Sequence, residues 1–444
     1  MSRVGCRKET WVLIKDLEYK PYPASAHREL DQAGTSTLGV PSFGFPSSSM
    51  SRTGRKDLSS LRVAVVHDWL PVAAGAELVL EQILAVFPQA DVFTLLNYLE
   101  GKDAQFLEGH SVSTSFIERL PGARTRYRYY LPLAPLAIEQ FDLREYDLVI
   151  SSSYVVAKGA LTGPDQLHVS YIHSPIRYAW DEYFSNLDAL ADRGVIVRGL
   201  LRLVLHYMRL YDGATASRPD ALLANSAFVA RRIRKYWGRE AQVLYPPVAV
   251  PDARPRVPGD YFVTASRLVP YKRVDVLVQA FAQLPDERLI VLGDGPELRK
   301  LRGLSTRNVE FMGHVSREEL LGKVAGAKAF LFAAREDFGI APVEAQALGT
   351  PVIAYGRGGV TETVVEGRTG MFFESQTPGA VAAAVSEFEE SDFDRTVIAE
   401  HGRRYGAARF RNALLTYIEG RWDSFQAQNE ASQLTMKSPS NGAS

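Results

Sequence analysis

The sequence predicts an α/β protein of two Rossmann-like domains, each a doubly wound parallel sheet, facing one another across a cleft. Three observations support this fold class. Short apolar, β-branched runs alternate with amphipathic helical segments, as parallel strands buried on both faces require. A proline-rich polar stretch lies at 251–260, and the alternation restarts after it. Ligands of such sheets bind outside the carboxyl ends of the strands, so polar residues there are the functional candidates.

The elements follow from the pattern in chain order. In the first half, strands are expected at 61–69, 90–96, 146–153, 167–174, 221–226 and 242–248. In the second half, they are expected at 260–266, 288–295, 308–315, 327–334 and 351–356. Helices with apolar residues at spacings of three and four separate the strands, and a last helical stretch covers 408–425.

The domain organisation is read from these elements and from composition. The predicted units are a disordered N-terminal extension (1–60), an N-terminal Rossmann-like domain (61–250), a linker (251–259), a C-terminal Rossmann-like domain (260–408), a helix packing back on the N-terminal domain (409–427) and a loose tail (428–444). The extension has no apolar core of signal-peptide type. Translation from Met50 is a further hypothesis, which peptides from 1–49 in the native protein would contradict.

Composition excludes some functions. The 51 basic and 51 acidic residues balance, which argues against a nucleic-acid partner. A single cysteine, Cys6, rules out an internal disulfide framework and fits a reducing, cytoplasmic setting. No apolar run is long enough to span a membrane.

The stretch 335–364 carries the densest polar and glycine pattern. Glu336 precedes a helix that begins near Ile340, with Pro342 in its first turn, and Glu344 lies inside it. A second helix is expected to start at Thr361 or Glu362. Free N–H groups at two adjacent helix starts favour a diphosphate, and the two glutamates suit hydroxyl groups of the same ligand. The alternative is a cluster of caps and turns with solvated glutamates.

Other strand ends add candidates. Arg267 and Lys272 follow the first strand of the second half, where two cations suit a diphosphate leaving group. Taken singly, each is better interpreted as a surface charge that caps a helix. His173 ends the strand 167–174, and Arg177 and Asp181 follow in a loop rich in Tyr and Trp. The loop GDGPEL (293–298) lacks the complete dinucleotide fingerprint.

Several motifs occur together in a known order: SRLVPYKRVD, VLGDGPEL, MGHVS, EDFGIAPVEAQALGTPVIA and GGVTETV. In their combination and spacing, they resemble family 4 retaining glycosyltransferases, which have the GT-B fold. The resemblance covers about residues 62–425, and it implies that the N-terminal domain (61–250) binds the acceptor and the C-terminal domain (260–408) binds the nucleotide-sugar donor. The stretches HDWLPVAAGAE, YIHSPIRYAWDEY and ANSAFVARRIRKYWGREAQVLYPPV resemble the subgroup of GDP-mannose-dependent mannosyltransferases of polysaccharide and O-antigen assembly.

The resemblance implies a role for each matching residue. Glu344 would hold the nucleotide ribose, and Glu336 the sugar hydroxyls, beside the backbone of Phe338, Gly339 and Ile340. Arg267 and Lys272 would bind the diphosphate. Gly75 would belong to a glycine loop closing over the phosphates, with Ala74 where many members have a second glycine. His173, Arg177 and Asp181 would form the sugar and acceptor pocket.

The implied reaction is transfer of a hexosyl group, mannosyl from GDP-mannose in the first instance, to a glycan or lipid-linked acceptor. It needs no cofactor and no metal. A UDP-sugar transferase, a nucleotide-sugar epimerase and a non-catalytic nucleotide-sugar-binding module remain alternatives. The segment 193–213, with four arginines among apolar residues, is either a peripheral inner-membrane helix or a core helix. The basic cluster at 231–235 is interpreted as a solvated face.

Overall fold

The computed structural model describes residues 58–72, 74–190, 194–249 and 255–437. The N-terminal sheet is entirely parallel, and its strands are β1 (Val63–His67), β2 (Asp91–Thr94), β3 (Val112–Thr114), β4 (Leu148–Ser153), β5 (Leu167–Ile172), β6 (Ala221–Ala224) and β7 (Gln242–Val243). They lie in the order β3-β2-β1-β4-β5-β6-β7. The direction of the order reverses between β1 and β4, which opens a crevice at their carboxyl ends.

Helices cover both faces of this sheet. They are α1 (Gly75–Val86), α2 (Ala123–Arg126), α3 (Ala134–Ile138), α4 (Tyr183–Ala189), α5 (Val195–Ala214) and α6 (Ala227–Trp237). Alternate residues of β1 serve opposite layers: Val63 and Val65 share a core with α1, and Ala64 and Val66 share one with α3 and α5. This two-sided burial explains why β1 reads as an unbroken apolar run.

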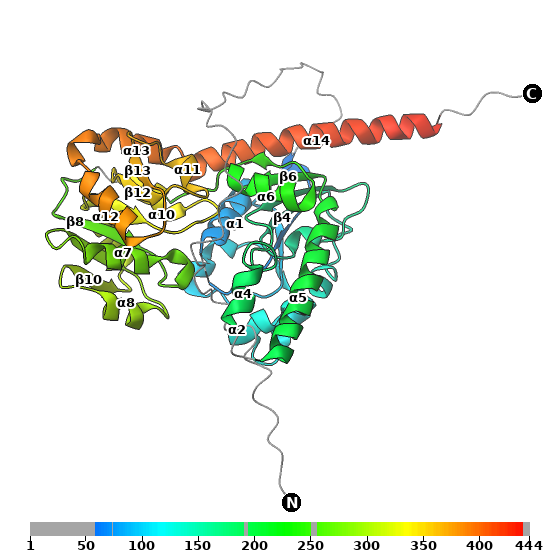
Figure 1. Ribbon diagram of the computed structural model, residues 1–444. Helices are drawn as coiled ribbons and strands as arrows, with labels where there is room; N and C mark the ends of the chain where they lie inside the picture. The colour runs from blue at the N-terminus through cyan, green and yellow to red at the C-terminus, as the bar shows by residue number, and fades with distance from the viewer. Residues whose placement is uncertain (1–57, 73, 191–193, 250–254, 438–444) are drawn as a thin grey trace, which may run out of the picture.

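The C-terminal domain repeats the architecture. Its parallel strands are β8 (Tyr261–Ala265), β9 (Arg288–Leu292), β10 (Val309–Gly313), β11 (Phe330–Phe332), β12 (Val352–Tyr355) and β13 (Gly370–Phe373), in the order β10-β9-β8-β11-β12-β13. Its helices are α7 (Val274–Phe281), α8 (Leu298–Leu304), α9 (Arg317–Ala325), α10 (Ile340–Ala347), α11 (Val360–Thr363), α12 (Pro378–Glu387) and α13 (Arg395–Arg403). Figure 1 shows the two domains side by side. The predicted fold class is confirmed.

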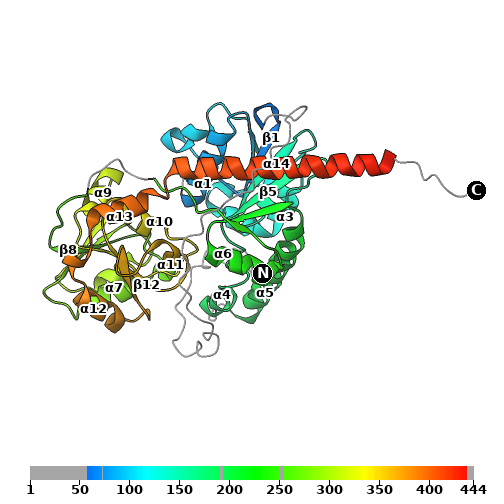
Figure 2. The same ribbon diagram turned by 90° about the horizontal axis from the view of Figure 1, so that it is seen from above.

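The last helix, α14 (Ala407–Lys437), leaves the C-terminal domain and runs across the N-terminal domain beside α1 (Figures 1 and 2). Phe410, Leu414, Ile418 and Trp422, spaced four apart, bury one stripe of it in the core shared with α1. The helix continues past residue 427, so the predicted loose tail is wrong for 428–437. That segment contains no proline or glycine to end the helix.

Other differences concern short elements. The strands β3 and β13 were not predicted, and β7 is shorter than expected. Most of the predicted extension (1–60), the start of the linker (251–259) and the last residues of the tail lie outside the described residues. None of the helices in the described part of the chain is both long and apolar enough to cross a membrane.

Candidate active site

A cavity of about 490 Å³ opens at the carboxyl ends of β8 and β9 in the C-terminal domain. This volume falls within the range of small-molecule sites, about 300–1,000 Å³. Its lining includes the polar residues Ser266, Arg267, Asp294, His314 and Glu344, and it is otherwise largely apolar. Apolar walls with a few convergent polar groups are typical of a cofactor or substrate site.

Arg267 and Glu344 reach the same cavity from different elements. Arg267 follows β8, and Glu344 projects from α10. The Glu344 carboxylate is 15% exposed and pairs with Arg317, whose Nη2 lies 2.5 Å from Oε1. Sequence analysis did not single out Arg317. The Glu344 carboxylate and the Arg267 guanidinium, both on the walls of this cavity, can bind hydroxyl and phosphate groups of a single ligand.

Lys272 and Glu336 form an ion pair in which both side chains are mostly buried. Burial opposes the charge of Lys272, but the Glu336 carboxylate raises its pKa above the ordinary value. Arg177, from the N-terminal domain, lies over the ring of Tyr271, 5.8 Å from its centre. Burial also opposes the charge of Arg177, but Asp337, Glu182 and Glu336 raise its pKa. Charged groups of both domains therefore meet beside Lys272 and Glu336.

The glycines at 358 and 359 let two loops pack directly on each other. Gly358 has φ +88°, and the Gly359 N–H donates to the Glu336 carbonyl at 2.8 Å. A Cβ atom on Gly359 would lie 2.3 Å from the Asp337 carbonyl oxygen. The helix α11 has only four residues, so it adds little to the expected diphosphate cradle. The glycines of this stretch mainly support the 335–339 loop, which carries Glu336.

Replacing Gly359 with alanine is expected to displace the 335–339 loop. The new methyl group would overlap backbone atoms, which cannot rotate away as a side chain can. Overpacking of this kind costs about 1–3 kcal/mol of stability. Urea unfolding measures the loss. Gly379→Ala is the control, because a Cβ atom there meets nothing within 4 Å. Equal stability of the two variants would contradict the packing argument.

The predicted glycine loop lies where the two domains touch. A Cβ atom on Gly75 would be 2.8 Å from Cδ1 of Ile340, at the start of α10. The preceding Ala74 N–H donates to Glu77 Oε2 at 2.9 Å, which fixes the turn. Phe338 is buried in an apolar cluster that includes Val248. The Phe338 side chain is thus part of the domain interface, and Gly339, with φ +89°, allows the chain to turn into α10.

His173 makes its contacts within the N-terminal domain. Its Nε2 lies 2.8 Å from Ser152 Oγ, and its ring packs edge-on against Tyr154 and Tyr171. Burial, aided by the nearby His67, lowers the pKa of His173 to about 3. The imidazole is therefore neutral at pH 7, suited to accept or donate a hydrogen bond rather than to supply a charge.

Acidification is expected to destabilise the N-terminal domain through its buried histidines. His168 is fully buried beside Ser151, and burial lowers its pKa to about 3. The unfolded chain binds a proton near pH 6.5 and the native state does not, so stability falls as pH drops from 6.5 towards 3. At pH 5, His168 alone costs about 2 kcal/mol. Urea unfolding of His168→Gln should show a stability difference between pH 7 and pH 5 that is smaller by this amount. An unchanged difference would contradict the buried, neutral state.

The loop of residues 174–182 carries Arg177 and Asp181. Arg177 pairs with Glu182 at 2.9 Å and lies 3.8 Å from Asp337 of the other domain. Asp181 forms an ion pair with Arg232 and accepts a hydrogen bond from Tyr236. The structure thus brings Arg177 to Lys272 and Glu336, whereas Asp181 lies in a network with residues of α6.

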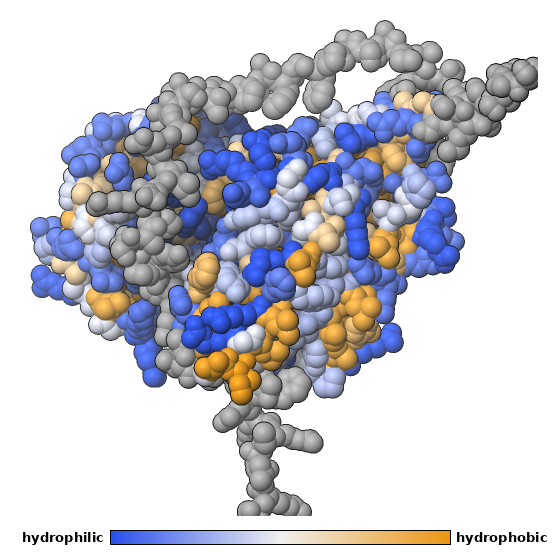
Figure 3. All heavy atoms as spheres, turned by 45° about the vertical axis from the view of Figure 1, so that its right-hand side comes forward, coloured by the Kyte–Doolittle hydropathy of each residue, from blue (hydrophilic) through white to orange (hydrophobic). Residues whose placement is uncertain are grey.

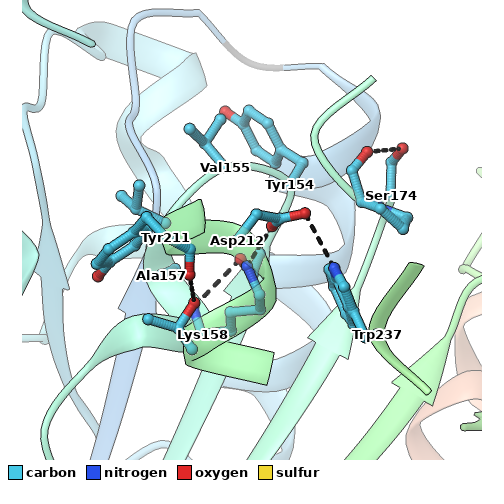
Figure 4. A network of polar contacts seen from close by, with 12 residues as sticks. Tyr154, Val155, Ala157, Lys158, Ser174, Tyr211, Asp212 and Trp237 are labelled. Carbon is cyan, nitrogen blue, oxygen red and sulfur yellow. Dashed lines mark hydrogen bonds and ion pairs between the residues drawn. The ribbon is translucent and has the colours of Figure 1, made fainter. Parts of the chain in front are cut away.

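Two buried carboxylates, those of Asp68 and Asp212, form hydrogen bonds in and near this loop, and the sequence did not reveal them. Asp68 accepts four backbone N–H groups, those of residues 154–157. Asp212, near the end of α5, pairs with Lys158 at 2.5 Å and accepts Nε1–H from Trp237 (Figure 4). It also accepts Nε1–H from Trp180, at 2.7 Å. Because Trp180 belongs to the 174–182 loop, this network fixes the loop to α5. The sequence does not reveal the partners of either residue: Asp68 lies in the predicted strand 61–69, and Asp212 lies in the segment 193–213.

No group of three or more His, Cys, Asp or Glu side chains is arranged to hold a metal ion within the described ranges. Metal independence itself stays a prediction.

Two parallel-sheet domains, with a cavity at the strand ends of one, form the arrangement of the GT-B fold of glycosyltransferases. The Anabaena protein HepE, solved with UDP-glucose, has this fold: the TM-score is 0.56 at 20% identity, covering 81% of this chain and 99% of that one. Residues 253–405 match the family model of glycosyl transferases group 1. The C-terminal domain therefore resembles that family, which confirms the resemblance to family 4 glycosyltransferases.

Proteins of similar sequence include named glycosyltransferases. A GDP-mannose-dependent monoacylated alpha-(1-6)-phosphatidylinositol monomannoside mannosyltransferase of Corynebacterium glutamicum is 30% identical over 223 residues, which cover 43% of this chain and 58% of that protein. A D-inositol 3-phosphate glycosyltransferase of Streptomyces avermitilis is 30% identical over 219 residues, 41% of this chain and 47% of that one. The chain thus spans about half the length of these relatives.

Proposed function

We propose that this protein is a retaining glycosyltransferase that moves a hexosyl group from a nucleotide-diphosphate sugar to a glycan or lipid-linked saccharide in polysaccharide biosynthesis. The observation that carries the proposal is the cavity on whose walls Arg267 and Glu344 meet. In this proposal, Glu344 accepts hydrogen bonds from the ribose hydroxyl groups, and Arg267 binds the diphosphate. The cavity lies in the domain that matches the glycosyltransferase family.

The proposed reaction does not depend on a nucleophilic side chain of the protein. The bond between the anomeric carbon and the phosphate oxygen breaks, and its electron pair leaves with the diphosphate. The acceptor oxygen bonds to the same face of that carbon, and its proton passes to the leaving phosphate. Arg267 and Lys272 stabilise the developing negative charge. Retaining glycosidases instead use two carboxyl groups about 5–5.5 Å apart, one as a nucleophile. No metal is required in this scheme.

The proposed donor is GDP-mannose. The name of the Corynebacterium relative supports it, because that enzyme is GDP-mannose-dependent. A UDP-sugar is the second candidate, supported by the fold shared with HepE, which was solved with UDP-glucose. Both candidates require the same cavity and the same cations.

Thermal unfolding with GDP, UDP, ADP, GDP-mannose and UDP-glucose tests the donor. A ligand at 100 times its Kd stabilises the native state by about 2.7 kcal/mol, which raises the melting temperature. We expect the largest shift with GDP and GDP-mannose. A preference for UDP ligands would keep the reaction and replace the donor. No shift with any of the five would contradict the proposed function.

A peripheral contact with the cytoplasmic membrane face is part of the proposal. The helix α5 (Val195–Ala214), which covers most of the segment 193–213, buries Leu201, Leu205 and Met208 but exposes apolar side chains on its other face. These are Val195, Ile196, Leu200, Leu203, Tyr207 and Leu210, of which Val195 and Ile196 are 86% and 87% exposed. Figure 3 shows hydrophobic and hydrophilic side chains together on the lower part of this side of the molecule. An amphipathic face with arginines suits an anionic lipid surface.

Sedimentation with vesicles tests this contact. We expect binding to vesicles of phosphatidylcholine with phosphatidylglycerol and much weaker binding to phosphatidylcholine alone. Leu203→Glu with Leu210→Glu should abolish binding. Val257→Glu, at an exposed apolar residue far from α5 in the chain, is the control. Equal binding of all variants would contradict a membrane role for α5.

A further inference from the structure

Arg232, on α6, lies buried where the two domains meet. The prediction of a solvated basic face at 231–235 is wrong for this residue: its side chain is only 7% exposed, whereas its neighbours Arg231 and Arg234 are exposed. On the N-terminal side, the Arg232 guanidinium donates to Ser174 Oγ at 2.9 Å and to the Pro175 carbonyl at 3.3 Å. These partners belong to the 174–182 loop, and so does Asp181, the ion-pair partner of Arg232.

The same guanidinium reaches the C-terminal domain. Its Nη1 lies 2.7 Å from Asp337 Oδ1, next to Glu336 in the 335–339 loop. The start of α6 is held there as well: Ser226 Oγ donates to the Asp337 carbonyl at 2.6 Å. The Glu362 carboxylate accepts the N–H groups of residues 227 and 228 at 2.7 and 2.8 Å. The helix α6 thus belongs to the N-terminal domain, and its first residues contact the C-terminal domain.

We propose that Arg232 is a positioning residue for transfer, which holds the 174–182 loop against the 335–339 loop. One planar guanidinium with five donors can bind Asp181 and Asp337 together, and these two carboxylates would otherwise repel each other. Arg232 is not part of the cavity lining, so it acts through the groups it holds. This inference rests on the proposed function, because it assigns the 335–339 loop to the donor and the 174–182 loop to the acceptor.

The structure suggests why the link matters for chemistry. Arg177 and Asp181 lie in one of the tied loops, and Glu336 lies in the other. Transfer requires the acceptor oxygen and the anomeric carbon to be held in one geometry, and small misplacements lower the rate strongly. Loss of Arg232 would also leave the carboxylates of Asp181 and Asp337 near each other without this shared cation.

The test compares Arg232→Met with Arg231→Met, the matched exposed control, and with Arg232→Lys. The first readout is the distance between spin labels on Lys102→Cys and Arg299→Cys, one in each domain, with Cys6→Ser in all proteins. The others are the Kd for GDP-mannose or UDP-glucose, whichever binds, and the turnover number. For Arg232→Met we expect a wider distance distribution, a Kd within about threefold of wild type and a turnover at least tenfold lower. Arg232→Lys should recover part of the turnover.

An unchanged distance distribution and turnover in Arg232→Met would overturn the proposal. If that variant does not fold, Asp337→Asn removes the charge of the same link; it should show the same changes, and wild-type behaviour would overturn the proposal. If the wild-type protein neither binds nor turns over any nucleotide sugar, the proposed function fails. The distance measurement then still decides whether Arg232 links the two loops.

Discussion

Replacing Lys272 with methionine is expected to lower the turnover number of transfer by about 100- to 1,000-fold. Removing one preorganised donor to a developing negative charge has effects of this size. Methionine keeps an unbranched side chain and removes the charge that pairs with Glu336. The initial rate of nucleoside diphosphate release at saturating donor measures the effect.

Lys300 provides the control for Lys272. It also pairs with a glutamate of the C-terminal domain, Glu297, but its side chain is 54% exposed, whereas that of Lys272 is 19% exposed. Exposed pairs of this kind contribute little. Lys300→Met should therefore keep the wild-type rate. A Lys272→Met enzyme with nearly wild-type turnover would show that the leaving diphosphate is stabilised elsewhere.

Replacing Glu344 with alanine is expected to weaken nucleotide binding by about 10- to 100-fold. A hydrogen bond to a charged group contributes about 1.5–3 kcal/mol, and the ribose hydroxyl groups would lose such an acceptor. Calorimetric titration of GDP and UDP into the wild type and the variant measures the change. The effect should appear with both nucleotides, because the ribose is common to them.

Arg317→Ala separates loss of the carboxylate from loss of the ion pair. The Arg317 side chain is 51% exposed and pairs with Glu344, and it does not line the cavity. Its removal leaves the Glu344 carboxylate in place, so nucleotide affinity should change by less than about fivefold. If Arg317→Ala weakens binding as much as Glu344→Ala, the glutamate acts through the ion pair and not on the ribose.

Much of the fold was predictable from local pattern. Strands such as β1 and β4 are buried on both faces, so their apolar runs stand out in sequence. The edge strands β3 and β13 have only three and four residues, and pairing with a neighbour creates them. The length of α14 was underestimated because its last residues are polar, although they contain no helix breaker.

The candidate site was predictable where function depends on position along a strand or helix. Arg267 follows a strand and Glu344 lies in the helix after a glycine turn, so both were found. Arg232 and Asp212 were not found, because their burial depends on contacts between segments distant in sequence. Arg232 has three other basic residues within three positions of it, and only the docking of α6 sets it apart.

Product analysis tests directly whether this protein transfers a hexosyl group from a nucleotide sugar with retention of configuration. The purified protein would be incubated with GDP-mannose or UDP-glucose and a glycan and lipid extract of the source cells, and all products identified by mass spectrometry and NMR. We expect a nucleoside diphosphate together with an equal amount of a new glycoside whose anomeric configuration matches that of the donor. An isomerised nucleotide sugar, a glycoside of inverted configuration or unchanged donor would contradict it.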